Sequence, residues 1–252
     1  MRRTRRVLLP SLVLAALVAV WELAVRAAEL PPFVLPAPTA VLAAGVRLHD
    51  ELGAHLATTL TEAGLGLAAG AFAGAGIAVV VALVPVIGDA VLPLVVLTQT
   101  VPTVVLAPLL ILWAGFGIGG KVVLVALTTF FPVMVATSSA MARADAELAD
   151  MVRGLGGGRR DELALVRLPA ALPGALAGLR IAATYAIGAA VVAEYLAGAS
   201  GIGVFIQHSR KAYAVDQILV GVLLVGLVTG ALVLAVDALS RRLVPWQRPD
   251  LS

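Results

Sequence analysis

A glycine-rich run that ends in lysine is the first part of this chain whose residue types and spacing could do chemistry. It reads Gly115-Phe116-Gly117-Ile118-Gly119-Gly120-Lys121. Such a run is similar to a phosphate-binding loop, whose backbone N–H groups and lysine hold the phosphates of a nucleotide. The next residue is Val122, however, where that loop needs a serine or threonine hydroxyl for Mg²⁺. No soluble strand precedes the run, so we interpret it as a connection between apolar segments and expect this chain not to bind ATP itself.

Nucleophilic and metal chemistry have little support in the remaining residues. The chain contains no cysteine, which excludes disulfides, thiol nucleophiles and cysteine metal sites. His49, His55 and His208 lie far apart, without the carboxylate spacing of a metal site. The pairs Thr128-Thr129 and Ser138-Ser139 lack a base at a spacing that would activate a hydroxyl. We therefore expect no enzymatic activity and no metal ion in this chain.

Polar side chains within apolar runs are the remaining candidates. Glu194 interrupts such a run, and an ionisable group there is costly enough to need a partner or a role. A structural partner and a part in a gate both remain open for it. A second polar cluster lies beside Pro102 and consists of Thr98, Gln99, Thr100 and Thr103. The cluster predicts either the lining of a solute path or hydrogen bonds between helices.

The composition places all of these residues in a membrane protein. Hydrophobic residues make up 61% of the chain and charged residues only 13%, with a mean hydropathy of +1.03. The apolar runs are long enough to cross a hydrocarbon layer, which takes about 20 helical residues, and they lack the alternation of barrel strands. We predict six membrane-spanning helices: Val7 to Val25, Leu56 to Val84, Ala90 to Ala114, Val122 to Met141, Pro169 to Leu196 and Gln217 to Leu239.

Small residues predict close packing between some of these helices. Gly66, Gly70 and Gly74 share one face of the second span, and Gly226 with Gly230 repeats the spacing in the sixth. Packing within one subunit and packing between two subunits both remain open.

The distribution of basic residues predicts the orientation. Arginines concentrate at both termini and in the segment between the fourth and fifth spans, which places these parts in the cytosol. This bias already accounts for the net charge of +3, so no nucleic-acid partner is expected. At the inner end of the last span, Asp237 precedes Arg241 by four residues, which favours a local ion pair.

The segment between the fourth and fifth spans is charged, patterned and broken by glycine. Its apolar residues follow helical spacing along one face: Leu148, Met151, Val152 and Leu155. Gly156-Gly157-Gly158 then ends the helix, and a second short helix is predicted from Arg159 to Val166, with Leu163 and Val166 on its apolar side. Two short amphipathic helices at the inner face fit either the lipid surface or a groove on a partner protein.

The same segment resembles the EAA loop of ABC-importer membrane subunits. That loop reads Glu-Ala-Ala, three residues, glycine, nine residues, isoleucine, one residue and Leu-Pro. Aligned on Leu168-Pro169, this chain has Val166 at the isoleucine position, Gly156 at the glycine position and Asp150-Met151-Val152 at Glu-Ala-Ala. The spacing is kept throughout, the acid is retained as aspartate, and larger apolar residues replace the two alanines.

Further motifs across nearly the whole chain are similar to the permease subunits of nitrate, sulfonate and taurine importers. They include Leu35-Pro36-Ala37-Pro38, Ile111-Leu112-Trp113 with Gly115 and Gly117, Leu168-Pro169 with Leu172-Pro173, and Ala193-Glu194 with Gly201-Ile202-Gly203. The resemblance implies a single permease domain over residues 1–252 in a bacterial inner membrane. Its fold would be the all-α, MetI-like fold of type I importers, with a core of about 54–242 and a cytoplasmic coupling loop at 144–169.

The resemblance also implies a function and a set of partners. The chain would form a homodimer with a solute path, bind an ATPase dimer that holds ATP and Mg²⁺, and receive a small solute from an extracytoplasmic binding protein. The solute would be a sulfonate, nitrate or taurine-like anion or a vitamin precursor. The residues that this resemblance assigns to ATPase coupling are Leu148, Asp150, Met151, Val152, Arg153, Leu155 and Gly156. The alternative from the residues alone is an ion-coupled secondary transporter without an ATPase, which predicts inverted repeats and ionisable relays near the membrane centre.

Overall fold

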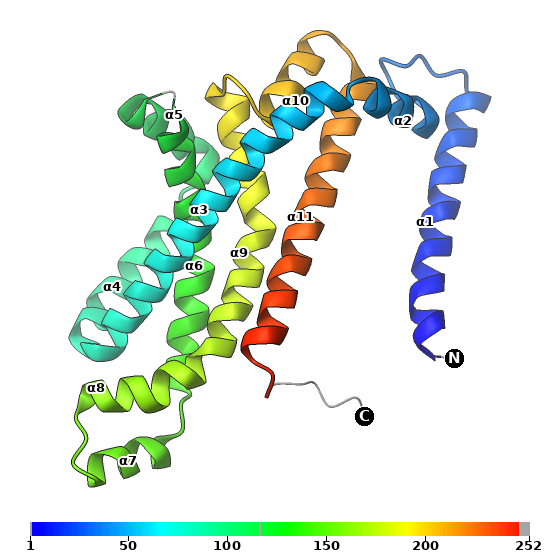
Figure 1. The fold of residues 1–252 in the computed structure, drawn as a ribbon. Coiled ribbons are helices and arrows are strands. Elements are labelled where there is room, and N and C mark those ends of the chain that lie inside the picture. Colours follow the sequence, from blue (N-terminus) through cyan, green and yellow to red (C-terminus); the bar gives the residue numbers. More distant parts are fainter. Residues whose placement is uncertain (1, 116, 247–252) are drawn as a thin grey trace.

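The computed structural model describes residues 2–115 and 117–246, and every regular element in those ranges is helical (Figure 1). The elements are α1 (Arg2–Ala27), α2 (Pro38–Arg47), α3 (His49–Leu83), α4 (Pro85–Thr98), α5 (Thr103–Ala114), α6 (Ile118–Ala142), α7 (Ala146–Gly154), α8 (Arg159–Glu162), the π-helical η1 (Leu163–Arg167), α9 (Leu168–Ala197), α10 (Ile202–Lys211) and α11 (Val215–Leu243). The predicted all-helical membrane fold is confirmed.

Helices α3, α6 and α9 form the centre of the bundle, and glycines allow α3 and α6 to approach closely. A Cβ atom on Gly66 would overlap the Val125 side chain, and one on Gly70 would overlap the Thr129 hydroxyl. Gly74 faces the α6 backbone in the same way. The glycine face of α3 therefore packs within the subunit, which answers the question that the sequence left open.

The glycines of α11 differ, because a Cβ atom on Gly226 or Gly230 would meet nothing within 4 Å. In the described part of the chain this pair therefore has no close helix neighbour. Its small-residue spacing is not used for packing within the subunit.

Replacing Gly70 by alanine is expected to destabilise the subunit. The new methyl group has no room against α6, and overpacking of this kind costs about 1–3 kcal/mol. Gly76→Ala is the matched control, since Gly76 lies on the same helix with open space around it. Thermal unfolding of the two purified variants checks this difference, and equal midpoints would refute the packing role of Gly70.

The predicted third span, Ala90 to Ala114, is wrong as a continuous helix. The chain instead forms α4 and α5, of 14 and 12 residues, with a break between Thr98 and Thr103. Pro102 causes the break, because it lacks an N–H and disfavours helical backbone at the residue before it. Neither piece reaches the length of about 20 residues that a perpendicular crossing requires.

Five helical segments within the described residues are long and apolar enough to cross a membrane, rather than the six predicted. They are Leu8–Ala27, His49–Leu83, Ile118–Ala142, Arg159–Ala197 and Val215–Leu243. The other five predicted spans overlap these segments and extend beyond them by at most one residue.

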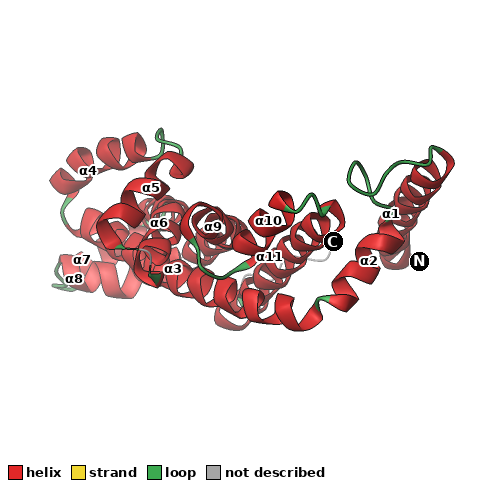
Figure 2. Cartoon of the chain, turned by 90° about the horizontal axis from the view of Figure 1, so that it is seen from above, coloured by secondary structure: helices red, strands yellow, loops and turns green. Residues whose placement is uncertain are grey.

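Helix α1 stands apart from the rest of the bundle in both views (Figures 1 and 2). Its connection to the body is made by Glu22, whose carboxylate accepts hydrogen bonds from the Thr39 backbone N–H at 3.1 Å and from the Thr39 hydroxyl at 2.9 Å. Arg26 pairs with the same carboxylate at 2.6 Å. The apolar surface of α1 is therefore left for lipid or another chain.

Asp237 does not form the predicted ion pair with Arg241. Its Oδ1 accepts a hydrogen bond from Arg180 Nε on α9, at 2.7 Å. The pair therefore joins α9 to α11 instead of stabilising one turn of α11.

Candidate functional site

Helices α7 and α8 project from one end of the bundle, while α2 and α10 lie at the opposite end (Figure 1). The projecting helix α7 begins after Asp145, whose carboxylate accepts hydrogen bonds from the backbone N–H groups of Glu147 at 2.8 Å and Leu148 at 3.4 Å. An aspartate in this position satisfies donors that have no partner inside the helix. The side-chain cap thus fixes where α7 starts.

The predicted apolar face of α7 is present and is largely uncovered. Leu148 is 47% exposed, Met151 56% and Leu155 82%. Val152 is half-buried and lies against Gly157, and Ala149, one turn before it on the helix, is buried. We call Leu148, Met151 and Leu155 the α7 apolar face. Three large apolar side chains on a helix outside the core are typical of a binding surface.

The helix ends at a glycine turn, as the sequence predicted. Gly156 has φ +89°, a left-handed conformation that side chains disfavour, and its N–H bonds to the Arg153 carbonyl at 3.0 Å. Gly157 has no room for a side chain, because a Cβ atom there would overlap Val152. The two glycines reverse the chain so that α8 returns beside α7.

Gly156→Ala is expected to destabilise this turn, because the new side chain must adopt φ +89° or shift the backbone. The cost should be about 1–2 kcal/mol, the penalty for an L-residue in that region. Gly154→Ala, inside α7 and with open space around it, is the control and should be neutral or slightly stabilising. Hydrogen exchange of the α7 backbone amides measures the effect, and faster exchange only in the Gly154 variant would contradict it.

Ion pairs attach the loop to the start of α9. The buried carboxylate of Glu162 accepts hydrogen bonds from Arg167 Nε at 2.8 Å and from Arg167 Nη2 at 2.6 Å. Arg153 of α7 lies 3.5 Å from the other oxygen of Glu162 and also pairs with Asp150 at 2.7 Å. Glu162 therefore joins Arg153 of α7 to Arg167, the last residue of η1 before α9 begins.

The second helix of the loop continues into α9 without a break. Leu163 and Val166, which were predicted on the apolar side of this helix, are both buried, and Leu163 packs against Ala140, Met141 and Ala171. The predicted helix from Arg159 to Val166 is α8 followed by η1, in which the Leu168 N–H bonds to the Leu163 carbonyl. One continuous helical rod thus runs from the loop into the centre of the bundle.

The residues predicted to line a solute path separate into two groups. Thr98, Gln99 and Thr100 are exposed at the break between α4 and α5, and their hydrogen bonds are local, such as Thr98 Oγ1 to the Val95 carbonyl at 2.6 Å. The side chain of Thr103 lies outside the described residues. Glu194 is buried and accepts a hydrogen bond from the Gly203 backbone N–H at 2.7 Å. None of the hydrogen bonds of the threonine group reaches Glu194.

The lysine of the glycine-rich run has a structural partner. Lys121 is 5% exposed and its Nζ bonds to Glu62 Oε1 at 2.5 Å. It is thus not available to a nucleotide phosphate, and the run connects α5 to α6 as interpreted from the sequence.

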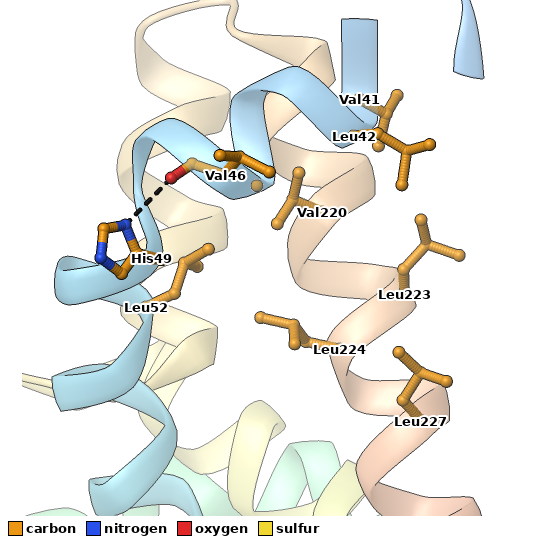
Figure 3. Close-up of a pocket in the computed structure, with 10 residues that line it drawn as sticks. Val41, Leu42, Val46, His49, Leu52, Val220, Leu223, Leu224 and Leu227 are labelled. Atoms are coloured by element: carbon orange, nitrogen blue, oxygen red, sulfur yellow. Dashed lines mark hydrogen bonds between the residues drawn. The ribbon is translucent and has the colours of Figure 1, made fainter. Parts of the chain in front are cut away.

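An apolar cavity of about 570 Å³ lies between α2, the start of α3 and α11 (Figure 3). Its lining is Val41, Leu42, Gly45, Val46, His49, Leu52, Val220, Leu223, Leu224 and Leu227. The His49 ring bonds to the Val46 carbonyl at 3.0 Å (Figure 3). Apart from His49, the cavity is lined by aliphatic side chains and one glycine.

Three features of the site were missing from the sequence interpretation. The Asp145 cap carries a local signal, an aspartate directly before an amphipathic helix. The Glu162–Arg167 bonds join residues five apart within one continuous helical segment, whereas the Glu62–Lys121 pair joins residues 59 apart through the fold. Only the first of these had a signal that a single sequence could supply.

Comparison with known proteins agrees with this architecture. Residues 66–249 match a family described as binding-protein-dependent transport system inner membrane component. The chain is 31% identical to the taurine transport system permease protein TauC of Escherichia coli K12, over 96% of this chain and 91% of TauC. It is 33% identical to the riboflavin transport system permease protein RibX of Chloroflexus aurantiacus, over 93% of this chain and 88% of RibX.

A solved structure shows the same fold. A chain of the MetNI methionine ABC transporter, in an inward-facing conformation, superposes with a TM-score of 0.62 at 19% identity, covering 78% of this chain and 95% of that one. At that identity the similarity establishes the fold alone. Together with the matched family and the relatives above, it shows that this chain belongs to the binding-protein-dependent inner-membrane transport components and is a membrane-spanning permease subunit of an ABC importer.

Proposed function

We propose that this permease subunit is driven by a separate ATPase that binds the α7 apolar face. The observation that carries the proposal is the exposure of Leu148, Met151 and Leu155 on a capped helix beyond the end of the bundle. Burying such side chains contributes up to about 1.5–3 kcal/mol each before ordering costs. ATP and Mg²⁺ would be held by the ATPase.

The charges on α7 favour binding in a groove of a partner protein over binding at the lipid surface. Around the apolar face, Asp150 and Glu147 accompany Arg153, so the polar side is mixed in sign. Interfacial helices, in contrast, are typically rich in lysine and arginine on that side. The mixed charge and the side-chain cap fit a helix that inserts into a partner.

Nucleotide-driven movement would pass from α7 to α9 through Arg153, Glu162 and Arg167. An ATPase that bound both conformations of the permease equally well would not change the equilibrium between them. The ATPase groove must therefore contact α7 differently in the nucleotide-bound and nucleotide-free states. The continuous rod of α8, η1 and α9 then changes its tilt within the bundle.

The remaining partners follow from the family. The subunit would pair with a second copy in a bacterial inner membrane, with both termini and the 144–169 loop in the cytosol and an extracytoplasmic binding protein at the opposite end. The solute would be a small organic anion or vitamin-like molecule, since relatives bear the names of taurine, aliphatic sulfonate, formylaminopyrimidine and riboflavin permeases.

Reconstitution tests the proposal. Proteoliposomes would contain this chain and the ATPase that co-elutes with it from its own host, with taurine, an alkanesulfonate and riboflavin as trial solutes. We expect ATP hydrolysis that is stimulated by the solute-loaded binding protein. Solute uptake driven by an ion gradient without ATP would refute the proposal in favour of a secondary transporter.

A further inference from the structure

A buried cluster of ionisable side chains joins the three central helices at the end of the bundle opposite α7. Glu62 of α3 is 1% exposed, Lys121 of α6 is 5% exposed and Glu194 of α9 is 1% exposed. Burying an ion without compensation costs several kcal/mol or more, so such a group must be paired or neutral. The hydrogen bonds within the cluster show which group compensates each charge.

One carboxylate is paired with the ammonium group and the other caps a helix. Glu62 Oε1 bonds to Lys121 Nζ at 2.5 Å. Glu194 Oε2 accepts a hydrogen bond from the backbone N–H of Gly203 at 2.7 Å, in the first turn of α10. Beside it, the Thr59 hydroxyl accepts a hydrogen bond from the Ile202 N–H at 2.9 Å. The cluster therefore holds the start of α10 against α3 and α9.

The turn between α9 and α10 covers the Glu194 side chain closely. A Cβ atom on Gly201, which has φ +120°, would overlap the Glu194 carboxyl group. A Cβ atom on Gly203 would crowd the Glu194 side chain, and one on Gly198 its backbone. These three glycines leave the carboxyl group little room to turn toward solvent.

Two oxygen atoms in this enclosed space have no hydrogen-bond partner among the described residues. They are Glu62 Oε2 and Glu194 Oε1, one from each carboxyl group. Glu62 lies one turn after Thr59 on α3, and Thr59 and Glu194 accept hydrogen bonds from the adjacent N–H groups of Ile202 and Gly203, so the two carboxyl groups share this site. A single proton on one of these oxygens would become a donor to the other and would satisfy both.

The charges in and around the cluster also favour one proton on the two carboxyl groups. Lys121 is the one ammonium group that bonds there, among the described residues, against two carboxyl groups. His55, the other titratable group at the turn, accepts a hydrogen bond from the Gly201 N–H through Nδ1 at 3.0 Å, which is possible only for a neutral ring.

The neighbouring helices supply no second cation to the cluster within the part of the chain that the structure describes. Helix α5 has no ionisable side chain, and the basic residues of α10 lie in its last turn. On α11 the ionisable residues lie in its first turn and near its other end, where Asp237 pairs with Arg180 of α9. One proton therefore brings the cluster to electrical neutrality.

We propose that Glu62 and Glu194 bind one proton between them, as a buried carboxylic acid and carboxylate pair. With Lys121 the protonated cluster is neutral, and in this form it holds the turn between α9 and α10 on the central helices. The ligand of this site is the proton, and the site is independent of how the ATPase binds.

Infrared difference spectroscopy of the purified permease and ATPase complex at neutral pH tests the proton directly. We expect the carbonyl stretch of a protonated carboxylic acid in the wild type, shifted in D₂O and lost in Glu194→Gln. Glu62→Gln should also lose the band, because Glu194 then becomes the sole counterion of Lys121. Glu162→Gln is the control and should keep it. Absence of the band in the wild type, or its persistence in both cluster variants, would overturn the proposal.

Thermal unfolding gives a second, independent readout. Glutamine imitates a protonated carboxyl group in shape and hydrogen bonding, so Glu194→Gln should unfold close to the wild-type temperature. Glu194→Ala should unfold well below it, because it leaves Glu62 Oε2 without a donor and creates a cavity. If the glutamine variant were as unstable as the alanine variant, the ionised carboxylate would be what the fold needs, and the shared proton would be rejected.

Discussion

Met151→Glu is expected to lower solute uptake by about 10- to 100-fold, the range that corresponds to roughly 1.4–2.8 kcal/mol of lost binding free energy. Met151 lies in the middle of the α7 apolar face and is 56% exposed in the subunit alone. In the proposed complex the new carboxylate would be buried in an apolar groove without a counterion. Uptake into proteoliposomes and co-elution of the ATPase measure the loss.

Ala146→Glu is the matched control for this prediction. Ala146 is exposed in the first turn of α7, away from the apolar face, and the substitution adds the same charge. An acid near a helix N-terminus is favourable, so folding should be unaffected. If both variants lowered uptake equally, the added charge rather than the apolar face would be responsible, and the docking surface would be elsewhere.

Lys121→Met is expected to be the most destabilising single substitution in the central helices. It leaves the Glu62 carboxylate buried without its cation, and breaking a buried pair in this way costs about 3–5 kcal/mol. The double variant Glu62→Gln with Lys121→Met removes both charges and should recover most of that loss. Thermal unfolding of the purified subunit measures both effects.

Lys211→Met serves as the control, because Lys211 is exposed in the last turn of α10. Its substitution should change stability little. Should the double variant be less stable than Lys121→Met alone, the pair would not act as a unit and the description of the buried cluster would fail.

Local features of the site were predictable because they depend on residues near one another in sequence. The α7 helix follows from the spacing of Leu148, Met151 and Leu155, and its end follows from Gly156, where φ is positive. The burial of Leu163 and Val166 follows from helical periodicity in the same way.

Features that depend on the fold were not predictable from a single sequence. Glu62 and Lys121 are 59 residues apart, and Arg180 and Asp237 are 57 apart, so neither pair has a local signal. The Asp237 pairing was mistaken for that reason: the nearby Arg241 was the visible candidate. Hydropathy likewise gave one long span at Ala90–Ala114, because Pro102 breaks the helix without changing how apolar the segment is.

Site-directed cross-linking tests whether the α7 apolar face contacts a nucleotide-driven partner. The chain has no cysteine, so Leu155→Cys provides a single reactive thiol at a side chain that is 82% exposed. Tyr213→Cys, at a side chain that is 78% exposed and at the opposite end of the bundle, is the control. We expect the thiol of the Leu155→Cys variant to cross-link to the ATPase in a yield that changes with bound nucleotide, while the thiol of the Tyr213→Cys variant forms no such cross-link. Labelling of the Leu155→Cys variant by a membrane-impermeant reagent from outside the cell, with no cross-link to the ATPase, would contradict binding of the ATPase to the α7 apolar face.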